Sequence, residues 1–208
     1  MIFPSYSKNW ERAIFLLLSI LCAFLDYVVC DFVAWVNKIP LFCDTTFIMA
    51  LSFFAGPWWG VLAGFFYHLI DLAVTRTLEF GQVFIICHFL AALTAGYYKI
   101  LFIKSSNSHP RIFLKLIVLS IVMVLVMSIS GGIIGYILNN IEAYNEASFQ
   151  TDFLTFLWHN SFKSKLLLQI AVRIPVNIGD RFICVFAAWG VYITARIIIT
   201  KNSIKKTD

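Results

Sequence analysis

Long apolar runs separated by short polar segments dominate the chain from end to end. A helix needs about 20 consecutive apolar residues to cross the hydrocarbon core of a bilayer. The pattern therefore predicts an all-α integral membrane protein, a bundle of about six transmembrane helices that forms a single membrane domain over residues 1–208. The expected spans are 13–36, 45–55, 58–73, 80–103, 112–138 and 175–199.

The second and third runs are separated only by Gly56-Pro57, which allows two interpretations. They form either one helix with a break in its middle or a short helical hairpin that turns at one membrane face. Charged residues flank both outer ends of the pair (Asp44, Asp71 and Arg76), and none lies near the break. The hairpin is favoured because Gly-Pro marks a turn and uncharged turns are compatible with a membrane face.

The segment between the last two spans differs from the other connections. A polar stretch over 139–165 is expected to form an outer loop, and the amphipathic pattern of 162–174 predicts a segment lying in the membrane interface. Pro175 then falls in the first turn of the last span, where a proline is well tolerated. The first run is too long for the apolar region of a signal peptide and is expected to be retained.

The distribution of basic residues predicts the orientation. Six spans place both termini on one side, and basic residues of short loops mark the cytoplasmic side. The side of the termini would carry ten basic residues, and the other side would carry four basic residues (Lys38, Arg76, Lys163 and Lys165). The ten are Lys8, Arg12, Lys99, Lys104, Arg111, Lys115, Arg196, Lys201, Lys205 and Lys206. We therefore expect a multi-pass protein of the cell membrane with cytoplasmic termini.

Composition narrows the function classes. With 61% hydrophobic and 13% charged residues and a mean hydropathy of +0.86, the chain is neither a soluble domain nor disordered, and its net charge of +5 needs no nucleic-acid partner. No motif of an enzyme, a cofactor site or a metal site is recognisable, so no catalytic residue, cofactor or metal is expected.

The five cysteines contain no CxxC pair. Cys30 and Cys43 are expected near the outer face, either bridged or as free thiols.

Polar residues within the spans are the candidates for a binding site, because ionisable groups in lipid are costly. Asn177, Asp180, Arg181 and Cys184 follow the i, i+3, i+4, i+7 spacing of one helix face in the outer half of the last span. They form either the polar wall of a pocket that opens outward or, through Asp180 and Arg181, ion pairs that lock the bundle. Both interpretations stay open from the sequence.

A second polar group follows the third span into the fourth. His68 and Asp71 are three residues apart near the outer end of one span, and Gln82 and His88 lie in the next. His88 is either a ligand contact or a buried histidine bonded to a backbone carbonyl. Asp26, deep in the first span, is a candidate partner for Arg181 or Arg173. The expected substrate-binding residues are Asn177, Asp180, Arg181, Asp71, His88, Gln82 and Arg173.

Three stretches resemble a known family of membrane proteins. They are Phe42-Cys43-Asp44-Thr45-Thr46, then Phe54 to Gly64 (FAGPWWGVLAG), and Arg173 to Arg181 (RIPVNIGDR). These stretches resemble the second, third and sixth helices of the substrate-binding (S) components of energy-coupling-factor (ECF) vitamin transporters. Chain length and the number of spans agree with that family along nearly the whole chain.

The resemblance implies a subunit that captures a vitamin-like small molecule at the outer face. It would pass this molecule inward while docked on a transmembrane T component and its ATPase subunits. In that family, small residues at four-residue spacing on the first helix make the docking surface, and Ser19 and Ala23 match those positions here. Packing of Ser19 and Ala23 inside the bundle is the alternative. The alternative function is a membrane-embedded ligand sensor or scaffold of the same fold that signals to a partner.

Overall fold

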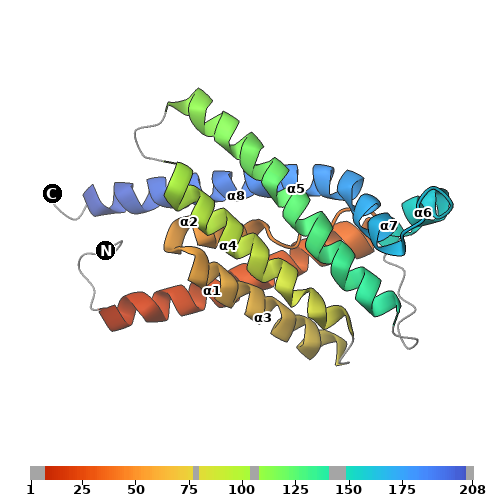
Figure 1. Cartoon of the computed structure of the whole chain (residues 1–208). Coiled ribbons are helices and arrows are strands. Elements are labelled where there is room, and N and C mark those ends of the chain that lie inside the picture. The colour runs from red at the N-terminus through yellow and green to blue at the C-terminus, as the bar shows by residue number, and fades with distance from the viewer. Residues whose placement is uncertain (1–7, 77–79, 104–107, 141–148, 205–208) are drawn as a thin grey trace.

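The structure, a computed structural model, describes residues 8–76, 80–103, 108–140 and 149–204. Three basic residues used above to predict the orientation lie outside these ranges: Lys104, Lys205 and Lys206. The described part of the chain is helical almost throughout (Figure 1). Its α-helices are α1 (Lys8–Cys30), α2 (Thr46–Ala55), α3 (Pro57–Thr75), α4 (Ile85–Phe102), α5 (His109–Asn139), α6 (Phe149–Trp158), α7 (Lys165–Ala171) and α8 (Arg173–Ile204).

Five helical stretches are long and apolar enough to cross a membrane, and the short apolar helix α2 adds a sixth segment. The long stretches are Asn9–Ala34, Pro57–Thr75, Gly81–Phe102, His109–Asn139 and Lys165–Lys201. A π-helical turn, η1 (Asp31–Val36), extends α1, and a 3-10 turn, η2 (Phe80–Phe84), precedes α4. The prediction of an all-α membrane bundle is confirmed, and the chain is a multi-pass membrane protein.

The predicted hairpin at Gly56-Pro57 is present. Gly56 adopts a backbone conformation (φ 104°, ψ 165°) that side chains disfavour, and Pro57 begins α3. Helix α4 crosses this turn closely, since a Cβ atom added at Gly96 would lie 2.7 Å from the Cα atom of Pro57. Small residues thus let the hairpin and α4 approach each other.

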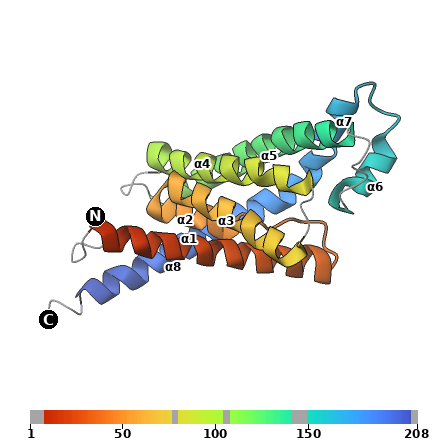
Figure 2. The same ribbon diagram turned by 90° about the horizontal axis from the view of Figure 1, so that it is seen from below.

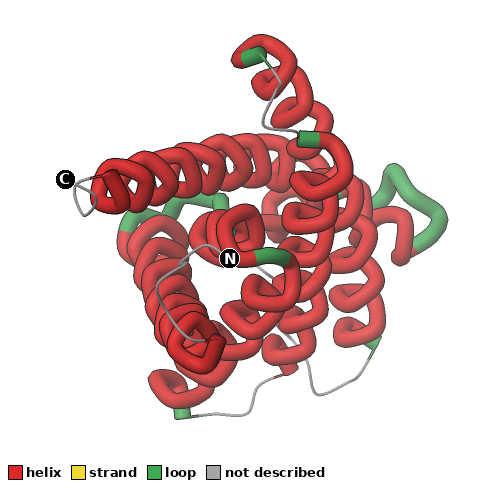
Figure 3. Tube along the Cα trace, turned by 90° about the vertical axis from the view of Figure 1, so that its left-hand side faces the viewer, coloured by secondary structure: helices red, strands yellow, loops and turns green. Residues whose placement is uncertain are grey.

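The chain ends and the polar connection lie at opposite ends of the bundle. Both views in Figures 1 and 2 place the N- and C-termini at one end, with α6 and α7 at the other. Figure 3 views the bundle from the end that carries the termini. The expected interfacial segment 162–174 contains α7 and leads directly into α8, whose third residue is Pro175.

Apolar side chains fill the interior of the bundle and also cover its outside. The interior includes Met49 and Phe53 of α2, Leu119 and Met123 of α5, and Val185 of α8. On the outside, large apolar residues such as Leu17, Ile100 and Leu114 are more than half exposed, as expected for helices that face lipid. Polar and charged side chains are costly inside such a bundle, so their positions define the candidate site.

One connection does not run over the surface. Residues 37–45, here called the inner loop, begin exposed at Asn37 and end with Cys43 and Thr45 buried inside the bundle. Cys43 has a positive φ of 50°, which is uncommon for a non-glycine residue. Helix α2 therefore starts inside the protein, and its first backbone N–H groups need partners within the bundle.

Candidate functional site

Asp26 of α1 supplies the partners for the start of α2. Its Oδ1 atom accepts a hydrogen bond from the backbone N–H of Phe47 (2.9 Å), and its Oδ2 atom accepts one from Ile48 (2.8 Å). The Asp26 side chain is fully buried. A carboxylate is favoured at this position because the N-terminal end of a helix carries partial positive charge. Asp26 thus caps α2 from another helix, and it is not the partner of Arg181 that the sequence suggested.

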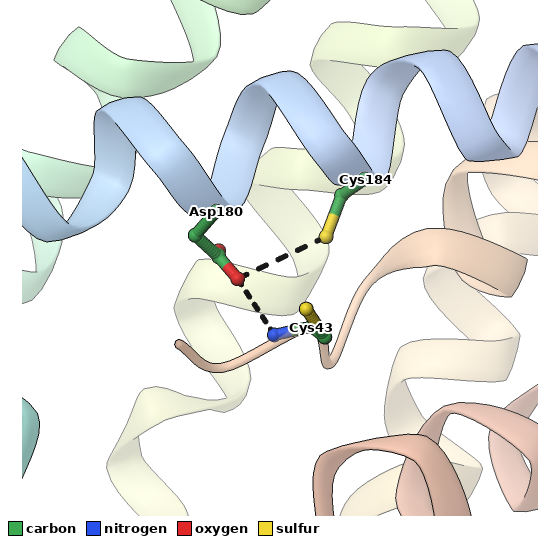
Figure 4. Close-up of side chains that lie close together, drawn as sticks. All are labelled: Cys43, Asp180 and Cys184. Carbon is green, nitrogen blue, oxygen red and sulfur yellow. Dashed lines mark hydrogen bonds between the residues drawn. The ribbon is translucent and has the colours of Figure 1, made fainter. Parts of the chain in front are cut away.

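Asp180 of α8 holds the inner loop in the same way. Its Oδ1 atom accepts hydrogen bonds from the backbone N–H groups of Phe42 (3.1 Å) and Cys43 (2.7 Å). Figure 4 shows the bond to Cys43, with the Asp180 side chain projecting from α8 toward the loop. Because a buried backbone N–H without a partner is costly, Asp180 stabilises the irregular backbone where it enters the bundle.

Arg181, the next residue of α8, binds the end of the inner loop. Its guanidinium donates to the Thr45 hydroxyl (2.5 Å) and to Asp44 Oδ1 (3.1 Å), and it also pairs with Asp180. Arg181 is buried, whereas the Asp44 side chain keeps 16% of its surface exposed. Burial raises the pKa of Asp44, but the neighbouring His88 and Arg181 outweigh it and leave this pKa below its ordinary value.

A row of side chains continues from Asp44 to the far end of α3. His88 Nε2 lies 3.2 Å from the Asp44 carbonyl oxygen, and His88 Nδ1 lies 3.0 Å from His68 Nε2. The Gln82 amide bridges the next gap, with its oxygen 3.0 Å from His68 Nδ1 and its nitrogen 2.6 Å from Asp71 Oδ2. Both histidines are buried, while Asp71 and Gln82 are half-buried. Asp71, Gln82, His68, His88 and Asp44 are called the histidine row below.

The structure joins five of the seven predicted site residues through the inner loop. Asp180 and Arg181 bind the loop directly, and His88, Gln82 and Asp71 belong to the histidine row that meets it at Asp44. The other two make separate contacts. Asn177 donates to the Ser128 hydroxyl of α5 (2.9 Å), and Arg173 donates to Gln169 (3.3 Å).

The sequence alone does not indicate Asp44 as a site residue, although Asp44 flanks an apolar run and lies in the first of the three stretches that resemble the S components. In the structure it links the histidine row to Arg181. Its position in a short polar run, Asp44-Thr45-Thr46, between strongly apolar residues is the signal that could have identified it.

The sulfur atoms of Cys43 and Cys184 and a carboxylate oxygen of Asp180 lie within 4.8 Å of one another, all buried (Figure 4). These are possible ligand atoms for a metal ion. However, the Asp180 carboxylate already accepts two backbone N–H groups and pairs with Arg181. The Arg181 guanidinium already supplies the positive charge beside the Asp180 carboxylate, so the chemistry of these three residues does not fit a metal site.

All five cysteines are free thiols. Cys43, expected near the outer face, is buried because the inner loop carries it into the bundle and Asp180 binds its N–H. Cys30 is half-buried at the end of α1.

The two residues expected to dock a partner lie inside the protein. Ser19 and Ala23 are fully buried. The Ser19 hydroxyl bonds to the carbonyl oxygens of Phe15 in its own helix (2.8 Å) and of Trp59 in α3 (3.3 Å). The small pair thus serves the close packing of α1 on α3, the alternative that the sequence left open.

No family model, no curated protein and no solved structure matches this chain. What the site can do is therefore judged from its own chemistry. Buried charges and amides surround an irregular backbone segment, and Asp44, Gln82 and Asp71 retain exposed surface. Together these groups offer both donors and acceptors of hydrogen bonds.

Proposed function

We propose that this chain is the substrate-binding membrane subunit of an ECF-type importer. In this role it captures a vitamin or similar micronutrient at the outer face and passes it inward when docked on a T component driven by ATPase subunits. The termini are then cytoplasmic, and the end carrying α6 and α7 faces outward. The excess of basic residues at the end with the termini supports this orientation.

The observation that carries the proposal is that the three family-like stretches meet in space. Asp180 and Arg181, from the third stretch, bind Phe42 to Thr45 of the first, more than 130 residues away. The second stretch joins them through Gly64, where an added Cβ atom would lie 3.0 Å from the Cβ atom of His88. His88 in turn contacts Asp44. Sequence features that lie far apart along the chain and converge on one buried polar site support a shared function.

The proposed substrate site is the part of this network that keeps exposed surface. Asp44 and Asp71 offer carboxylate oxygens and Gln82 offers an amide, which suits the hydroxyl, amine and ring-nitrogen groups of a water-soluble vitamin. Asp180 and Arg181 then act behind the site by fixing the backbone that carries Asp44. The inner loop is the element that a bound substrate would contact first.

The test begins with the full-length protein expressed alone and together with a T component and its ATPases. Native mass spectrometry of the purified protein should reveal a retained small molecule, and a panel of thiamine, riboflavin, biotin and pantothenate should include one that raises the unfolding temperature. A ligand at 100 times its Kd stabilises a protein by about 2.7 kcal/mol. Co-purification with the module and uptake of the same vitamin are expected.

Gln82→Ala should weaken binding of that vitamin at least tenfold, whereas Asp31→Asn, at an exposed position of η1, should leave it unchanged. Ligand binding without association with the module and without uptake would contradict the importer and favour a sensor. Failure of all four vitamins together with absence of a retained molecule would contradict a vitamin-binding subunit.

A further inference from the structure

The histidine row has too few hydrogen atoms for its contacts when both imidazoles are neutral. The row contains four contacts: Asp71 to Gln82, Gln82 to His68, His68 to His88, and His88 to the Asp44 carbonyl oxygen. Each contact needs one hydrogen between its two atoms. The two end groups, a carboxylate and a carbonyl oxygen, only accept, so the hydrogens come from the three residues between them.

Those three residues supply one hydrogen too few. The Gln82 amide can donate in one direction along the row, because its other side presents the oxygen. A neutral imidazole likewise has one donor and one acceptor nitrogen. Three donated hydrogens serve four contacts, and this count is the same for either orientation of the amide and either tautomer of each ring. One contact would then bring two acceptors to about 3 Å inside the bundle, which is repulsive.

We propose that the histidine row is a proton-binding site that holds one excess proton, shared by His68 and His88. An imidazolium donates from both nitrogens, so a single added proton completes all four contacts. If His88 carries it, Nε2 donates to Asp44 and Nδ1 donates to His68. If His68 carries it, both rings keep their contacts with the direction of the hydrogen bond between them reversed. The proton can thus move between the rings along the 3.0 Å contact.

The charges around the pair favour a cation. Asp71 closes the row at one end, and the carboxylate of Asp44 lies 3.6 Å from His88 Nε2 at the other. Tyr67 stacks on the His88 ring with ring centres 4.5 Å apart, an arrangement that attracts a cation. Arg181 opposes the proton, but Asp180 and Asp44 balance its charge. Cys30 and Cys87 add two free thiols on α1 and α4, and Tyr67 adds a phenol on α3.

The site goes beyond the proposed function because it ties proton binding to the position of the inner loop. With the proton present, His88 donates to the Asp44 carbonyl and holds the end of the loop. With the proton lost, either this contact or another in the row becomes repulsive and opens. A change in the hydrogen bond at the Asp44 end of the row therefore alters the hydrogen bonds at the other end, which involve the half-buried Asp71 and Gln82.

The test uses nuclear magnetic resonance of the full chain, labelled with 15N-histidine, in lipid nanodiscs at pH 8. The chain has four histidines, and His109 and His159 are exposed. The variants His109→Asn and His159→Asn assign the two exposed rings. We expect the remaining pair to show one imidazolium, with three protonated nitrogens over the two rings, and two neutral rings would overturn the proposal.

Asp71→Asn provides the sharpest variant, because the introduced amide can donate where the carboxylate could only accept. Gln82 can then turn its amide, and four hydrogens serve four contacts with both imidazoles neutral. The imidazolium signal should therefore disappear at pH 8, while in Asp31→Asn, the same change at an exposed site, it should persist.

Gln82→Leu tests the count of donated hydrogens independently, because it removes two contacts and one donor from the row. Two neutral imidazoles then donate enough hydrogens for the contacts that remain. An imidazolium that survives in both Asp71→Asn and Gln82→Leu would show that neighbouring charge alone, and not the count of donors, holds the proton. That result would overturn the donor count from which the proposal is argued. Circular dichroism of each variant checks that the helices are retained.

Discussion

Replacing Asp26 by alanine tests whether α2 depends on a cap supplied by α1. The substitution removes both acceptors of the Phe47 and Ile48 N–H groups and offers no substitute inside the bundle. Each buried donor left without a partner costs about 1–3 kcal/mol. Part of this cost is offset because a buried carboxylate no longer has to be desolvated. We expect a net loss of about 2–4 kcal/mol in the free energy of unfolding.

Asp26→Asn should lose about half as much, because one side-chain oxygen remains to accept a hydrogen bond. The assay is reversible unfolding in mixed detergent micelles, followed by circular dichroism and by tryptophan fluorescence. Asp31→Ala, which removes an exposed carboxylate five residues further along the same helical stretch, is the matched control and should change stability by less than about 0.5 kcal/mol. If Asp26→Ala were as stable as this control, the cap would contribute nothing and the reasoning would be refuted.

Three further predictions concern packing and contacts elsewhere in the bundle. Gly96→Ala should destabilise the protein by about 1–3 kcal/mol, because the added Cβ atom would overlap Pro57. Gly190→Ala, at a position with open space, should not destabilise it, and the unfolding temperatures of the two variants test this difference. Asn177→Ala and Ser128→Ala should each cost about 1 kcal/mol, and the double variant should cost less than their sum, which a double-mutant cycle measures. Diamide, a membrane-permeant oxidant, should link Cys43 to Cys184, detected as a cross-linked peptide by mass spectrometry, and no such peptide should form in Cys184→Ser.

The spans could be predicted from the sequence because each depends on local composition. Apolar runs and the Gly56-Pro57 break fixed the helices to within a few residues, and the structure has α2 and α3 on either side of that break. The spacing of Asp180 and Arg181 also indicated correctly that both face the interior. Predicting such features requires only the period of a helix and the energetic cost of polar groups in lipid.

The partners of Asp26 and Asp180 could not be predicted, because they are mainly backbone groups. Asp26 and Asp180 bind N–H groups of the chain around Phe42 to Ile48, and any residue there except proline offers an N–H. A search for oppositely charged side chains therefore points elsewhere, as it did for Asp26. The sequence does not distinguish Asp44 as a site residue for a related reason, since a charge at the edge of an apolar run is typical of a membrane surface.

The late position of Asp180 and Arg181 in the chain has a consequence for biogenesis. Helix α2 has ten residues and is about 15 Å long, half the thickness of a bilayer core. When α2 has just been synthesised, Asp180 and Arg181, which bind the inner loop, lie more than a hundred residues further along the chain and have not yet been translated. The inner loop and α2 therefore lack these contacts during early synthesis, and their folding is completed only when α8 packs against them.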